Sequence, residues 1–184
     1  AGKIKETVSI PVSTVGRIID PVMAERILES NKADIVGLGR PLLADPDWVN
    51  KTASGNTCDI RRCISCNKGC TDNIQNRTFL SCVLNAENGY EEKRCITPAD
   101  VKKNIVIVGG GCAGLEAARV AAQKGHTVTL FEKESSLGGQ LTIACVPPRK
   151  EEMRRAIYNL VHAVNKEGVT LRIGETATLE KILS

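Results

Sequence analysis

The sequence predicts an α/β protein with parallel strands, organised around a segment rich in cysteine. Three observations predict it. Strand-like and helix-like segments alternate through the first 55 residues, an order that favours parallel strands joined by crossover helices. A glycine-rich turn joins a strand to a helix after residue 104. Between these parts, four cysteines lie close enough in sequence to bind one metal centre.

The first part of the chain contains two strand–helix units. Residues 10–16 (IPVSTVG) predict a buried β-branched strand. Residues 20–21 (Asp-Pro) predict a helix start, with Asp as N-cap and Pro at the first helical position. Residues 34–39 (DIVGLG) predict a second strand, and residues 45–46 (Asp-Pro) open a short helix that stops near residue 55. Because two such units cannot bury both faces of a parallel sheet, we expect this part to belong to something larger.

The cysteine segment has the spacing C-x2-C-x3-C-x11-C, formed by Cys63, Cys66, Cys70 and Cys82. Soft thiolates in such a group select iron–sulfur clusters or zinc over hard cations. A four-cysteine zinc site usually contains two tight pairs, whereas these ligands fall as three plus one, which favours a [4Fe–4S] cluster. Gly69 is expected to let the backbone approach the centre closely. Zinc and disulfides remain the alternatives.

Composition narrows the possible classes of protein. The net charge is +4, with 25 basic and 21 acidic residues interleaved, so no basic arm predicts a nucleic-acid partner. Aromatic residues make up 3% of the chain, too few for platforms that stack on single strands. We see no apolar stretch of membrane-spanning length and no secretory leader. A cytoplasmic chain is therefore expected, in which the thiols stay reduced and clustered cysteines bind metal.

A dinucleotide-binding pattern begins at residue 104. Residues 104–108 (NIVIV) predict an apolar strand that runs directly into the glycine-rich turn GGGCAG. A helix follows and is expected to end at Gly125, after which the strand TVTLFE ends at Glu132. Strand, G-x-G-x-x-G, helix, strand and acid in this order are the fingerprint of a dinucleotide-binding domain.

Each conserved feature of that fingerprint has a physical role. Gly109 permits the tight turn, Gly111 lets the backbone approach a pyrophosphate, and Gly114 lets helix and strand pack closely. Glu132 is expected to accept hydrogen bonds from ribose hydroxyls. A second glycine pair, in the sequence LGGQL at residues 137–141, allows another close approach and favours FAD over NAD. The strand VTLRIG completes a unit with fewer strands than a doubly wound domain normally has.

In this order, the motifs resemble the iron–sulfur flavoenzymes of the old yellow enzyme class. That group includes 2,4-dienoyl-CoA reductase, 2-enoate reductase and the bile-acid-inducible NADH:flavin oxidoreductases. The seventh and eighth strands of the family's TIM barrel are similar to IPVSTVGRIIDP and ADIVGLGRPLLADPDW. The cysteine spacing resembles that of the dienoyl-CoA and enoate reductases. The FAD-domain motifs of the family are similar to VGGGCAGLEAA and LFEKESSLGGQL.

The resemblance implies three pieces. Residues 1–57 would be the end of an FMN-binding TIM barrel (strands 7–8), and residues 58–100 a [4Fe–4S] cluster segment and linker. Residues 101–184 would be the N-terminal part of a Rossmann-like FAD-type domain. The partner implied is the remainder of the same enzyme: barrel strands 1–6, an NAD(P)H domain and the rest of the FAD domain. The resemblance implies no nucleic-acid or membrane partner and allows a homo-oligomeric parent enzyme.

The resemblance also assigns residues. FMN would be bound by Gly16, Arg17, Gly39 and Arg40. The cluster would be held by Cys63, Cys66, Cys70 and Cys82. FAD would be bound by Gly109, Gly111, Gly114, Glu132, Lys133, Gly139 and Gln140. No catalytic residue is expected in this chain, because the family's barrel acids and flavin contacts lie on other strands. The remaining cysteines match no ligand position: Cys58, Cys95, Cys112 and Cys145.

An activity follows from the same resemblance. The parent would be an NAD(P)H:flavin oxidoreductase of the enoate reductase class, passing electrons from FAD through the cluster to FMN. Its substrate would carry an activated C=C bond, of enoate or dienoyl-CoA type, and the chain alone would be inactive. The alternative is a stand-alone electron-transfer or four-cysteine metal-binding module without catalysis of its own.

Overall fold

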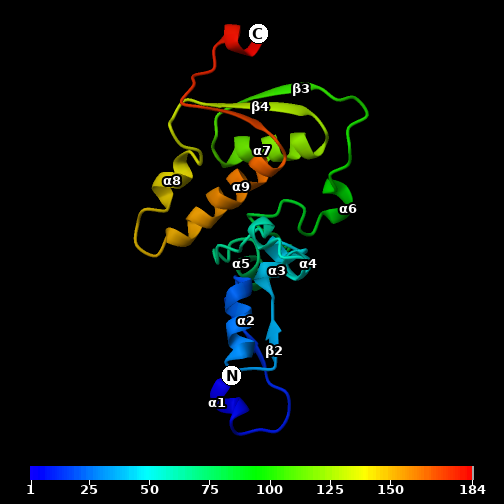
Figure 1. Cartoon of the computed structure of the whole chain (residues 1–184), viewed down its shortest axis with the longest axis vertical. Helices are drawn as coiled ribbons and strands as arrows, with labels where there is room; N and C mark the ends of the chain where they lie inside the picture. The colour runs from blue at the N-terminus through cyan, green and yellow to red at the C-terminus, as the bar shows by residue number, and fades with distance from the viewer. Residues whose placement is uncertain (184) are drawn as a thin grey trace. The chain divides into compact units, whose positions relative to one another are not determined.

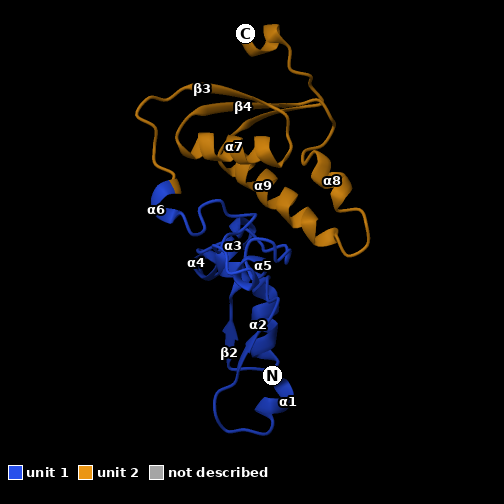
Figure 2. Ribbon diagram, turned by 180° about the vertical axis from the view of Figure 1, so that it is seen from behind, with its two compact units in different colours: residues 1–93 blue, residues 94–184 orange. Residues whose placement is uncertain are grey.

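The computed structural model describes residues 1–183, which divide into two compact units (Figures 1 and 2). The first unit spans residues 1–93 and the second begins at residue 94. Most of the cysteine segment therefore packs with the first unit. Within the described range, helices that are both long enough and apolar enough to cross a membrane are absent.

The first unit begins with a short helix and a parallel strand pair. Helix α1 (Gly2–Lys5) precedes β1 (Ser13–Val15), α2 (Pro21–Glu29) and β2 (Ile35–Gly37), and β1 pairs with β2 in parallel. The predicted start of α2 is confirmed, since the Asp20 carboxylate accepts a hydrogen bond from the Val22 amide at 2.9 Å. The strand–helix–strand order therefore produces the parallel pairing expected of it.

The prediction of a buried strand over residues 10–16 is wrong in extent and in burial. Strand β1 has three residues, and the side chains of Ile10 and Val15 are 70% and 73% exposed. On β2, Ile35 is 55% exposed. The described residues of this unit provide one pairing partner for each strand. The apolar residues of the pair thus lack the second covering layer that a buried parallel sheet requires.

The segment after β2 forms two short helices and a 3₁₀ turn: α3 (Arg40–Ala44), α4 (Trp48–Ala53) and η1 (Thr57–Asp59). The predicted short helix near Trp48 is confirmed as α4, although its N-cap residue is Asp47 and not Asp45. Trp48 is 4% exposed and its indole N–H donates to the Ile19 carbonyl at 3.2 Å. This contact fixes the helix against the loop that follows β1.

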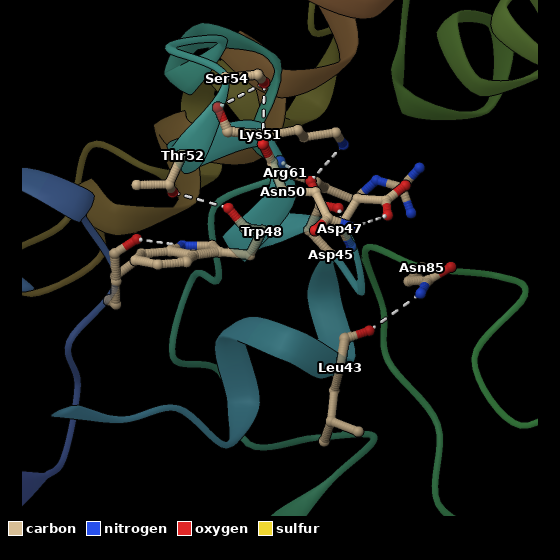
Figure 3. Close-up of polar contacts among 11 residues, drawn as sticks. Leu43, Asp45, Asp47, Trp48, Asn50, Lys51, Thr52, Ser54, Arg61 and Asn85 are labelled. Atoms are coloured by element: carbon tan, nitrogen blue, oxygen red, sulfur yellow. Dashed lines mark hydrogen bonds and ion pairs between the residues drawn. The ribbon is translucent and has the colours of Figure 1, made fainter. Parts of the chain in front are cut away.

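Asp45 instead connects three segments (Figure 3). Its Oδ2 accepts hydrogen bonds from the Arg61 amide and the Lys51 ammonium, both at 2.7 Å, and its Oδ1 accepts from the Asp47 amide at 3.1 Å. The residue is 3% exposed. A carboxylate can be buried at this position because charged and backbone donors replace the water that it loses. The carboxylate thereby holds the start of the cysteine segment against α4.

The cysteine segment contains little regular structure. Helix α5 (Thr71–Gln75) lies within it and α6 (Glu91–Arg94) crosses the boundary of the units. The side-chain amide of Asn85 donates to the Leu43 carbonyl at 3.0 Å, which ties the end of the segment to α3 (Figure 3).

The second unit is a three-stranded parallel sheet with helices packed on one face (Figure 1). Its elements are β3 (Asn104–Val108), α7 (Cys112–Gln123), β4 (Thr127–Glu132), α8 (Gln140–Ala144), η2 (Glu151–Met153), α9 (Arg154–Lys166), β5 (Thr170–Ile173) and α10 (Leu179–Leu183). The strand order is β3-β4-β5, so β4 is central. Gly125 ends α7 in a left-handed conformation, with φ of 89°, one residue beyond the C-cap Lys124.

The core of this unit lies between the sheet and helices α7 and α9. Fully buried side chains from the three elements meet there: Leu115, Ala118, Leu130 and Val164. On β3, Ile105 and Ile107 pack against this core, whereas Val106 and Val108 alternate away from it and are 38% and 64% exposed. Strand alternation thus leaves an apolar second face on the sheet.

The Asp45 contacts predict a local loss of stability. Replacing Asp45 by Ala would leave the partly buried Arg61 amide and the Lys51 ammonium without their acceptor, at a cost of about 1–3 kcal/mol. We expect faster amide hydrogen exchange at Arg61 and in the cysteine segment, by about tenfold or more. Hydrogen-exchange mass spectrometry measures it. Asp47→Ala is the matched control, because Asp47 is exposed, and equal exchange in both variants would contradict the assigned role.

Candidate cofactor sites

A pocket lies where the two strands of the first unit end. Gly16 and Arg17 follow β1, Gly39 and Arg40 follow β2, and all four line one pocket of about 210 Å³. Because β1 and β2 are parallel, their carboxyl ends meet at the same edge of the sheet. The structure therefore brings together the four residues predicted to bind FMN.

The backbone at the first of these strand ends has an unusual conformation. Gly16 and Arg17 both have positive φ, 129° and 49°. A non-glycine residue in the left-handed region is uncommon and often marks a functional site. Arginine guanidinium groups suit phosphate oxygens in charge and in geometry. This strand end is thus suited to an anionic group.

Arg40 lies between this pocket and the cysteines. Its Nη1 donates to the Asn67 side-chain oxygen at 2.5 Å. Asn67 has a left-handed backbone, with φ of 64°, and its carbonyl accepts from the amide of Cys70 at 3.2 Å. The same asparagine therefore holds the arginine and shapes the cysteine loop.

The four predicted ligand cysteines surround a second, smaller pocket of about 20 Å³. They line it together: Cys63, Cys66, Cys70 and Cys82. In the described part of the chain, no three His, Cys, Asp or Glu side chains converge closely enough to hold a single metal ion. All eight cysteines are free thiols. The thiols thus enclose a small space without meeting at one point.

A glycine makes this arrangement possible. The Ser81 amide donates to the Gly69 carbonyl at 2.7 Å, and a Cβ on Gly69 would lie 2.6 Å from the Ser81 carbonyl oxygen. Gly69 therefore lets the segment carrying Cys82 approach the loop carrying Cys70. This close approach is made between two segments of backbone, and the predicted approach of Gly69 to a metal centre stays a prediction.

Charge and burial act in opposite directions on the thiols. Burial raises the pKa of Cys63 and of Cys82. At Cys63 the Ser65 amide, 3.3 Å from Sγ, and the charge of Arg40 both lower the pKa. Backbone amides of Leu84 and Asn85 do the same for Cys82. These donors favour the thiolate form that a metal ligand requires.

The glycine loop of the second unit has two kinds of glycine. A Cβ on Gly114 would overlap the Gly109 carbonyl oxygen, so this glycine is needed for helix and strand to pack. A Cβ on Gly111 would meet no protein atom within 4 Å, so the space beside it is open. One on Gly139 would lie 3.1 Å from the Gly111 Cα. The two glycine motifs therefore adjoin.

The Glu132 carboxylate anchors the glycine loop to the end of β4. Its Oε2 accepts from the Gly110 amide at 2.6 Å and its Oε1 from the Glu134 amide at 2.8 Å. These two amides, the Glu134 amide first, lower the pKa of the carboxyl group. Its predicted contact with a ribose stays a prediction. Lys133 is largely exposed and Gln140 is the first residue of α8.

Sequence reasoning missed two residues, Ser65 in the wall of the first pocket and Asn67 in the wall of the second. Ser65 and Asn67 flank Cys66, and both have a left-handed backbone, with φ of 54° and 64°. Asparagine is frequent in that conformation, so Asn67 offered a weak signal. Ser65 offered none, because its importance depends on the folded loop and on the neighbouring strand ends.

Comparisons with known proteins agree with this division. Residues 1–58 match the NADH:flavin oxidoreductase / NADH oxidase family, and residues 104–177 match the FAD dependent oxidoreductase family. A bilirubin reductase of Mediterraneibacter gnavus is 63% identical over 182 residues, which cover 99% of this chain and 28% of the relative. A metal reductase of Desulforamulus reducens is 44% identical, covering 98% and 27%.

A solved structure extends the comparison to the fold. A complex of 2-naphthoyl-CoA reductase with 2-naphthoyl-CoA superposes with a TM-score of 0.92 at 31% identity, over 97% of this chain and 27% of that one. The chain spans just over a quarter of the length of the curated relatives described above. Both family matches, their order and the cysteine segment between them agree with one group of enzymes. Along its length the chain is therefore similar to one segment of the iron–sulfur flavoenzymes of the old yellow enzyme class.

Proposed function

We propose that the chain is part of an NAD(P)H-dependent oxidoreductase in which it binds FMN, a [4Fe–4S] cluster and part of FAD. One observation carries this proposal. Cys63 and Arg40 line both the pocket at the strand ends and the pocket enclosed by the cysteines. A group in either pocket would thus share a wall with a group in the other. Such proximity is what electron transfer between two cofactors requires.

The pocket at the strand ends fits the phosphate end of FMN. Two arginines and three glycines line it, at the edge where parallel strands of α/β proteins commonly bind phosphate. Arg17 and Arg40 would neutralise the phosphate, and the positive φ of Gly16 turns the backbone at that edge. We propose that β1 and β2 are the seventh and eighth strands of a TIM barrel.

The cysteine pocket fits a cluster better than a single zinc ion. Zinc needs four sulfurs, each about 2.3 Å from one point. A cubane cluster instead binds each thiolate to a different iron atom, so its ligands surround a volume. All four cysteines line one pocket. This geometry and the three-plus-one spacing support the cluster.

The glycine loop fits the pyrophosphate of FAD. Open space beside Gly111 leaves room for the phosphates, and Gly139 adjoins it from the second motif. The ionised carboxylate of Glu132 fixes the Gly110 amide, so the loop is already ordered. Lys133 and Gln140 lie on the same segment and complete the proposed set.

When bound, the three cofactors would supply the chemistry of the proposed reaction. FAD would accept hydride from NAD(P)H, the cluster would carry single electrons, and FMN would deliver hydride to an activated C=C bond. The protein residues described above bind and orient these groups. Bilirubin is the first substrate to test, since the relative named bilirubin reductase is 63% identical. Enoates and dienoyl-CoA esters are the next.

The remainder of the enzyme is the proposed partner of this chain. Ile10, Val15 and Ile35 expose apolar side chains on or beside the strand pair, and Val106 and Val108 expose the second face of the other sheet. Further strands and helices of a longer polypeptide would cover these surfaces, as in a complete barrel and a doubly wound domain.

The cluster assignment predicts a colour and a metal content. Full-length enzyme purified without oxygen should be brown, contain iron and sulfide, and reduce bilirubin or an enoate with NADH or NADPH. Cys66→Ser should lower the iron content by at least half, because it removes one of the four thiolate ligands. Iron and sulfide analysis measures this. Cys95→Ser is the control, and stoichiometric zinc without sulfide would overturn the assignment.

At the FAD site, one glycine substitution should impair FAD binding and another should impair the stability of the domain. Gly111→Ala should weaken FAD binding more than tenfold, since its methyl group would occupy the space left for the phosphates. Its backbone is extended, with φ of −75°, so stability should change little. Gly114→Ala should instead destabilise the domain by about 1–3 kcal/mol through overpacking. Calorimetric titration and thermal unfolding distinguish them, and loss of FMN in Gly111→Ala would show that the two sites are exchanged.

The FMN site predicts an effect of Arg40 and a smaller one of Asn67. Arg40→Ala should weaken FMN binding about tenfold or more and spare FAD, because a charge-assisted contact with phosphate is lost. Asn67→Gly keeps the left-handed backbone and removes the Arg40 partner, so a smaller loss is expected. Reconstitution with each flavin measures both affinities. Equal losses of FMN and FAD would count against the site.

A further inference from the structure

Ser65 has three structural features that no contact with a neighbouring residue accounts for. Its hydroxyl Oγ is buried and has no hydrogen-bond partner among residues 1–183. Its backbone is left-handed, with φ of 54°. It lines the pocket at the strand ends, together with the two arginines.

The left-handed backbone makes a serine costly at this position. Glycine would adopt φ of 54° without strain, whereas the Cβ of serine clashes with its own backbone there. A residue kept in a strained conformation points to a function when the strain is observed. The feature that serine has and glycine lacks is the hydroxyl.

Ser65 lies in the part of the cysteine loop that lines the pocket at the strand ends. The Ser65 amide donates to the Cys63 Sγ at 3.3 Å, so the backbone of this residue serves the cysteine site. Ser65 does not line the pocket enclosed by the cysteines, and it does line the pocket of Arg17 and Arg40. Rotation about one side-chain bond changes where Oγ points.

We propose that the Ser65 hydroxyl donates a hydrogen bond to the phosphate of the FMN bound at the strand ends. The inference rests on the proposed function of this pocket. A buried hydroxyl without a partner is unfavourable, and a phosphate oxygen is a strong acceptor. The guanidinium groups of Arg17 and Arg40 line the same pocket and attract that anion. Ser65 is thus a further binding residue, contributed by the cysteine loop.

The test compares flavins with and without the phosphate. The full-length enzyme is freed of flavin and titrated with FMN and with riboflavin. In Ser65→Ala, FMN should bind about tenfold more weakly, while riboflavin affinity stays within twofold of the original. Ser65→Gly should show the same loss for FMN, since it also lacks the hydroxyl. Its flavin-free form should melt at an equal or higher temperature, because the strain is relieved.

Controls separate this role from a structural one. Asn88 also has a buried side-chain nitrogen without a partner, among the described residues, and lines neither pocket. Asn88→Ala should leave FMN affinity within twofold. The inference is overturned if Ser65→Ala leaves FMN affinity unchanged, weakens riboflavin equally, or loses iron together with FMN. If the unmodified enzyme binds no FMN, the proposed function is wrong, and the inference about Ser65 is wrong with it.

Discussion

The arrangement of the first unit depends on one buried carboxylate. Asp45 lies just after α3 and accepts hydrogen bonds from Lys51 and from the amide of Arg61. Cys63 lies two residues after Arg61. By holding the Arg61 amide, the Asp45 carboxylate therefore fixes the position at which the cysteine loop begins. The contact between Asn85 and Leu43 fixes the other end of the segment. With both ends fixed, an irregular segment can hold four thiols around one pocket.

The loop held in this way serves two sites at once. Its cysteines enclose one pocket, while Ser65 and Cys63 form part of the wall of another. Asn67 joins the two through its bond to Arg40. Short polar residues in left-handed conformations allow the backbone to turn sharply between the cysteines. The loop therefore lines both the pocket at the strand ends, where we propose FMN, and the pocket of the four cysteines, where we propose the cluster.

The sequence predicted helices and strands well where a short motif or a hydrophobic period defines them. The strand NIVIV, the helix after the glycines and the strand TVTLFE lie where periodicity and the glycine fingerprint placed them. The prediction failed where distant contacts decide the outcome. Asp45 resembles a helix cap in sequence, but only its Oδ1 bonds the adjoining turn, at the Asp47 amide, while its Oδ2 accepts from Arg61 and Lys51. Ser65 became a candidate binding residue only because the fold places it in the pocket at the strand ends, and sequence spacing does not predict that placement. Burial of residues 10–16 likewise depends on strands that the described chain does not supply.

The bond between Glu132 and the Gly110 amide has a consequence for cofactor engineering. In dinucleotide-binding domains an acidic residue at this position contacts the ribose and so contributes to the choice between nucleotides. Here the acid also anchors the glycine loop that we propose binds the pyrophosphate. Exchanging it for a neutral or basic side chain would loosen that loop, so a change of nucleotide preference and a loss of loop order would come together. A redesign would have to supply a replacement acceptor for Gly110 from another side chain.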